Sequence, residues 1–71
     1  MRLAVEFEVE TDGRWLADVP ELPGVMAYGA TRDEALARVQ ALAFSVLADE
    51  IEHGERDAKT LMTVSFEATA A

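Results

Sequence analysis

The groups with the most evident chemical potential are carboxylates on segments that a fold could bring together. Two-metal hydrolysis needs carboxylates from separate elements that converge within about 4 Å of shared ions. Glu6 or Glu8, Glu34 and Glu67 come from separate segments and are the candidates. Glu34, however, is placed to cap a helix, and the other glutamates alternate with apolar residues as on an exposed strand. We therefore expect no metal site and no nuclease activity.

Other groups that could do chemistry lack the neighbours that they would need. His53 is the sole histidine, and it lies where a helix is expected to end, so that its cationic form would suit the negative end of the helix dipole. Ser45 is a lone hydroxyl within that helix, without a motif that would activate it as a nucleophile. The sequence thus predicts a protein that is not an enzyme and uses no cofactor.

Acidic residues on two neighbouring strands are candidates for binding a partner. Glu6, Glu8 and Glu10 form a ladder on the polar side of the first predicted strand, and Asp18 lies on the strand expected beside it. Such a patch would complement a cationic protein surface and speed the encounter with it. The alternative is an ordinary solvated strand face.

Aromatic and turn residues supply further candidates for partner contacts, because aromatic side chains are enriched at binding hot spots. Leu22 and Glu21 lie in a turn bracketed by two prolines, and we expect Leu22 to be hard to bury there. Tyr28 is expected to be exposed. Trp15 is also a candidate, although it shares its side of a strand with Ala17 and could be ordinary core.

The charge balance restricts the class of partner. The 71-residue chain has 14 acidic and 6 basic residues, a net charge of −8. A phosphate backbone would be repelled, since nucleic-acid affinity depends on Lys and Arg, so we expect no direct nucleic-acid binding. A basic protein would be attracted.

Half of the residues are apolar, a high fraction for a domain of this size. We therefore expect a homodimer or higher homo-oligomer. Leu42 and Phe44 broaden the apolar stripe of the predicted helix and are the candidate oligomer contacts.

The chain has no cysteine, and its N-terminus places an acidic residue at alternate positions, so we expect neither a disulfide nor a signal peptide nor a membrane span. A cytoplasmic protein is the resulting expectation.

The periodicity of the sequence predicts four strands and one helix. Alternation of apolar and polar residues predicts strands at 2–10, 15–19, 25–28 and 62–68. Asp12-Gly13 predicts a hairpin turn, and Pro23-Gly24 fits the centre of a type II turn. Thr31 and Glu34 form a capping box in which Glu34 would reach back to the Thr31 N–H; the helix should run to about residue 53 and end at Gly54.

These elements predict an α+β fold with the order β-β-β-α-β. Hairpins make the first three strands antiparallel, and a right-handed helical crossover leads to a parallel last strand. The prediction is a single domain over residues 1–71, a two-layer sandwich whose mixed sheet has the order 3-2-1-4 and carries the helix on one face.

The spacing Trp-x-Ala-Asp-x-Pro-Glu-Leu-Pro-Gly-x-x-x-x-Gly-x-Thr-x-x-Glu-Ala over residues 15–35 resembles the HicB antitoxin family, including its short stand-alone members. The resemblance implies a partial RNase-H-like domain that binds and neutralises a small basic toxin of the HicA type, a ribonuclease that cleaves mRNA. Many members of the family carry a C-terminal DNA-binding domain. Residues 1–71 contain no counterpart of it, so we do not expect them to bind operator DNA. Members without a toxin also exist, and an orphan protein-binding or regulatory module is the alternative.

Overall fold

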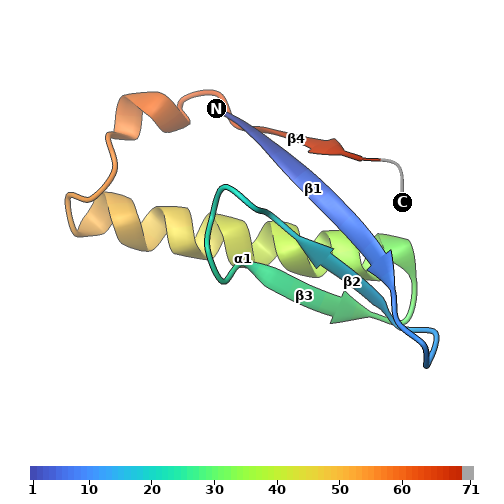
Figure 1. Ribbon diagram of the computed structural model, residues 1–71. Helices are drawn as coiled ribbons and strands as arrows, with labels where there is room; N and C mark the ends of the chain where they lie inside the picture. The colour runs from blue at the N-terminus through green and yellow to red at the C-terminus, as the bar shows by residue number, and fades with distance from the viewer. Residues whose placement is uncertain (70–71) are drawn as a thin grey trace.

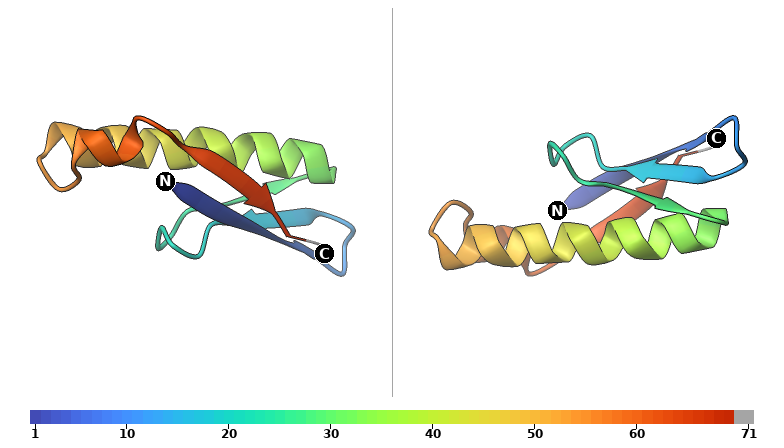
Figure 2. Two further views of the ribbon diagram at one scale, coloured as in Figure 1. Left: turned by 90° about the horizontal axis from the view of Figure 1, so that it is seen from above. Right: turned by 90° about the horizontal axis from the view of Figure 1, so that it is seen from below.

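The computed structural model describes residues 1–69 as a four-stranded sheet with a helix on one face (Figures 1 and 2). Its elements are β1 (Arg2–Val9), β2 (Trp15–Asp18), β3 (Met26–Gly29), α1 (Arg32–Glu52), a short 3-10 helix η1 (Ala58–Leu61) and β4 (Ser65–Ala68). The strand order is β3-β2-β1-β4; β2 is antiparallel to both of its neighbours, and β4 is parallel to β1. The predicted α+β layout and the order 3-2-1-4 are confirmed.

The hairpin between β1 and β2 is held by its own backbone and by one carboxylate. Gly13 has a φ of +90°, which explains why glycine suits this turn. The Asp12 carboxylate accepts the Arg14 backbone N–H at 3.1 Å, and this hydrogen bond lowers the pKa of Asp12. Val9 is 52% exposed, so the alternating pattern of burial ends before β1 does.

Two consecutive tight turns connect β2 to β3. The Leu22 N–H donates to the Val19 carbonyl, and the Val25 N–H donates to the Leu22 carbonyl, each at 3.0 Å. Gly24 has a φ of +83°, as the third position of a type II turn requires. This confirms the predicted Pro23-Gly24 turn.

α1 is capped at its start by Thr31 and at its end by His53, just before Gly54, as the sequence predicts. The Thr31 hydroxyl accepts the Glu34 N–H at 3.1 Å. One detail of the predicted capping box is wrong: the Glu34 carboxylate accepts the N–H of Ala30, at 3.2 Å, rather than that of Thr31. At the other end Gly54 has a φ of +71° and reverses the chain.

The first turn of α1 lies directly on the end of β3. A Cβ placed on Gly29 would lie 2.9 Å from the Ala35 Cα and closer still to the Ala35 backbone nitrogen. Glycine is therefore required at position 29 by this approach of helix to strand. Below it, the buried side of the helix meets the apolar side of the sheet in one core, formed by Leu3, Val5, Ala17, Val19, Leu22, Val25, Ala35, Val39, Ala43 and Leu47.

Gly29→Ala should destabilise the protein, because the added methyl group must push α1 away from β3. Overpacking of this kind costs about 1–3 kcal/mol in the free energy of unfolding, measurable by urea denaturation. Ala30→Ser, at the adjacent exposed position, is the control and should change stability little. Equal stability of Gly29→Ala and the wild type would contradict the close approach.

The segment before β4 differs from the sequence prediction. A strand was expected from Met62, but η1 occupies Ala58–Leu61 and β4 starts only at Ser65. The Asp57 carboxylate accepts the Lys59 N–H at 2.9 Å and caps the short helix. Met62 follows η1 and is 83% exposed, so it does not belong to the apolar side of the strand.

Candidate functional site

The face of the sheet that α1 leaves uncovered carries a cluster of carboxylates, Glu6, Glu8 and Asp18, which we call the acidic face. Glu6 of β1 lies directly opposite Asp18 of β2, and Glu8 lies opposite Leu16. Together with Phe7 these residues line a shallow depression of about 320 Å³. The structure therefore brings together three of the acidic residues that the sequence singled out.

The acidic face has no internal compensation within residues 1–69. The five ion pairs among these residues involve other carboxylates, and none involves Glu6, Glu8 or Asp18. Like charges directly opposite each other on adjacent strands destabilise a sheet. The Glu6–Asp18 pair thus works against the stability of the isolated domain.

Apolar side chains adjoin the acidic face on the side of β3. Tyr28 lies opposite Leu16, and Met26 lies opposite Asp18. Both side chains are exposed, Met26 to 50% and Tyr28 to 41%. Exposed apolar groups thus lie beside acids that form no ion pair within residues 1–69.

Tyr28 has contacts within the chain that the sequence did not reveal. The Arg14 guanidinium lies 4.4 Å from the centre of the Tyr28 ring, and the Tyr28 hydroxyl donates to a Glu10 carboxylate oxygen at 3.3 Å. The ring therefore already has a cation over one of its faces. No pattern in the sequence pointed to this pair, because Arg14 belongs to a hairpin loop and Tyr28 to a different strand.

Of the other candidate contacts, Leu22 and Trp15 do not lie on the acidic face. Leu22 was expected to be exposed, and this is wrong: only 3% of it is exposed, because the two turns around it direct its side chain into the core. Trp15 is half-buried and lies on the side of the sheet that faces α1. Its ring is edge-on to that of Phe7, with the ring centres 6.3 Å apart. Glu21 is exposed and accepts the Ala4 N–H through a long hydrogen bond of 3.4 Å.

Leu42 and Phe44 are both exposed, at 37% and 52%, but they lie on different flanks of α1. Two residues along a helix turn through about 200°. Phe44 packs edge-on against Phe66 of β4, with ring centres 5.5 Å apart. Leu42 follows Arg38 by one turn, and Arg38 contacts β3. They therefore cannot form one continuous contact surface.

The carboxylates considered for two-metal chemistry are not brought together. Glu34 lies at the start of α1, on the covered side of the sheet, where it pairs with Arg38 at 3.1 Å. Glu67 lies in β4 and pairs with Arg2. Neither joins Glu6 in any cluster of potential metal ligands within residues 1–69.

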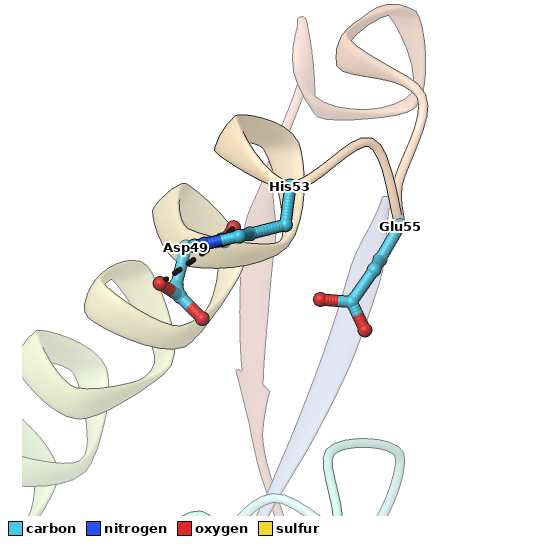
Figure 3. Close-up of side chains that lie close together, drawn as sticks. All are labelled: Asp49, His53 and Glu55. Carbon is cyan, nitrogen blue, oxygen red and sulfur yellow. Dashed lines mark hydrogen bonds and ion pairs between the residues drawn. The ribbon is translucent and has the colours of Figure 1, made fainter.

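One such cluster does occur in residues 1–69, at the end of α1 (Figure 3). Potential ligand atoms of Asp49, His53 and Glu55 lie within 4.8 Å of one another, and all three residues are exposed. The reversal of the chain at Gly54 brings Glu55 back beside His53, which sequence spacing alone did not suggest. The His53 Nδ1 atom already bonds the Asp49 carbonyl at 2.8 Å, so the arrangement is explained as part of the helix end.

Comparison with protein-family models, with curated proteins and with solved structures gives no match for this chain. The resemblance to the HicB family stays a prediction from the residues. Within residues 1–69, no helix has both the length and the apolar character that a membrane crossing requires.

Leu22→Ala should lower the free energy of unfolding by about 2–5 kcal/mol, as truncation of a buried leucine does. Tyr28→Ala, at an exposed position, should cost less. Urea denaturation of both variants tests the assignment of Leu22 to the core and Tyr28 to the surface. A larger loss in the free energy of unfolding for Tyr28→Ala than for Leu22→Ala would contradict this assignment.

Proposed function

We propose that this protein is a protein-binding module that uses its acidic face to hold a small basic partner. The observation that carries this proposal is the uncompensated cluster of Glu6, Glu8 and Asp18 beside the exposed side chains of Met26 and Tyr28. A cationic partner would pair with these three carboxylates, which form no ion pair within residues 1–69.

The acidic face lowers the stability of the isolated domain, and this supports a role in binding. Opposed carboxylates reduce stability, whereas a bound cation would turn their repulsion into attraction. Functional sites are where departures from the most stable arrangement are expected. The net charge of −8 would also steer a basic partner toward the protein at long range.

The resemblance of residues 15–35 to the HicB family gives the partner its proposed identity. We propose an antitoxin that neutralises a basic ribonuclease of the HicA type by covering its active surface. The orphan module without a toxin is the second candidate, since it would use the same face for another basic protein.

Coexpression with the product of the adjacent reading frame tests the antitoxin proposal. Expression of a small basic neighbour alone should arrest growth, and this protein should restore it. A neighbour that is not toxic, or toxicity that this protein leaves unchanged, would reject the toxin pair. Binding of a basic protein without any toxicity would favour the orphan module.

Glu8→Lys should weaken the complex and lower its rate of association, because it reverses a charge on the acidic face. Glu52→Lys is the matched control: it changes the net charge equally, on an exposed position of α1 away from this face. Surface plasmon resonance at low and high salt gives both rates, and salt should slow association of the wild type. Equal effects of the two variants would show that net charge, not this face, governs binding.

Glu6→Gln should have opposite effects on stability and binding. Removing one of two opposed carboxylates should raise the free energy of unfolding by about 0.2–1 kcal/mol. It should also weaken the complex with the basic partner. Urea denaturation and a binding titration give the two values, and a variant that is both less stable and a tighter binder would contradict the assignment.

A further inference from the structure

β4 is an edge strand of the sheet, with β1 as its one neighbouring strand among residues 1–69 (Figure 1). The N–H groups of Ser65 and Thr69 donate to carbonyls of the neighbouring strand, those of Met1 and Val5, at 2.8 and 2.9 Å. Successive residues of a strand direct their backbone groups to opposite sides. Phe66 and Ala68 therefore present N–H and C=O groups outward, as an edge that can accept a further strand.

The opposite edge of the sheet is guarded. Arg38 of α1 donates to the outward carbonyl of Tyr28 in β3, at 2.9 Å, and is itself held by Glu34 at 3.1 Å. Cover of an edge strand by a helix hinders the addition of another strand, and here a helix side chain also occupies an outward carbonyl. Within residues 1–69 no side chain makes a hydrogen bond of this kind to the outer edge of β4, so the two edges differ.

An apolar flank accompanies the open edge. α1 packs on β2 and β3, and only the Phe44–Phe66 pair joins it to β4 by an aromatic contact. Phe44 remains 52% exposed on this flank. A strand added to β4 would bring its own side chains next to this exposed ring.

Charge decides which partner suits this edge. A second copy carries the same net charge of −8, and it is repelled wherever acids stand uncompensated, as on the acidic face. On β4 the one acid, Glu67, is already paired with Arg2 of β1. The β4 edge is thus a locally neutral, apolar surface with open backbone groups.

We propose that a second copy of this chain binds here, with the two β4 strands antiparallel across a two-fold axis. An edge that offers both donors and acceptors is self-complementary under such an axis. The two sheets would join into one, with both helices on the same side and Phe44 and Phe66 of each copy near the axis. This inference does not depend on the toxin proposal, because the acidic face of each copy stays free.

Proline substitution at each edge tests the inference by sedimentation equilibrium. The wild type should form dimers, and Ala68→Pro should raise the dimer dissociation constant by about tenfold or more, because symmetry removes the lost hydrogen bond twice. The N–H of Ala68 points away from β1, so the substitution costs no bond within the chain. Met26→Pro is the matched control on the guarded edge and should leave the dimer unchanged.

Phe44→Gln should also weaken the dimer, while Leu42→Gln, on the other flank of α1, should not. Circular dichroism of each variant confirms that the fold is kept. A wild type that is monomeric at every concentration would overturn the proposal. A dimer that resists both Ala68→Pro and Phe44→Gln would overturn it equally.

Because the sequence has no cysteine, single introduced cysteines can show by disulfide cross-linking how the two β4 strands pair. If Phe66 lies opposite Ala68 of the second copy, Glu67→Cys should form a disulfide with itself. If Phe66 lies opposite Phe66, a mixture of Ser65→Cys and Glu67→Cys should cross-link instead. Ser45→Cys, on the exposed side of α1, is the control. Cross-linking no faster than this control in every combination would rule out β4 pairing.

Discussion

The contact on which the rest of the structure depends is the approach of α1 to the end of β3, where Gly29 meets Ala35. Because no side chain separates the two backbones, the helix is fixed close to β3 and β2 on one side of the sheet. Two consequences follow. Within residues 1–69 the opposite side of the sheet is left without a covering layer, and β4 lies at the sheet edge, where Phe44 of the helix packs on Phe66.

The two surfaces that this arrangement leaves open differ in charge, and that difference separates their partners. On the acidic face, Glu6 and Asp18 oppose each other without a counter-charge within residues 1–69, so a cation is the partner that relieves them. Along β4, by contrast, the one acid, Glu67, is paired with Arg2. The basic partner and the second copy that we propose would therefore occupy separate surfaces of the chain.

Most of the fold could be predicted because its signals are local. Alternation along β1, the Asp12-Gly13 turn and the cap at Thr31 depend on residues close in sequence, and the handedness of a helical crossover then sets the strand order. The acidic part of the candidate site was also predictable, since strand pairing follows from the hairpin. The burial of Leu22 was not, because two successive turns decide together where its side chain points. The 3-10 helix was missed because its cap at Asp57 is a weak local signal beside the alternating pattern that follows it.

The sequence by itself determined the elements, their order and the acidic character of one strand face, since each depends on the periodicity and the turn chemistry of neighbouring residues. Only the tertiary structure decided which of these groups face one another. It placed Arg14 over Tyr28, paired Arg2 with Glu67, and separated Leu42 from Phe44 on two flanks of one helix. The physical reason is that such placements depend on residues far apart in the chain, whose distances are set by the register of the strands and by the packing of α1 on the sheet.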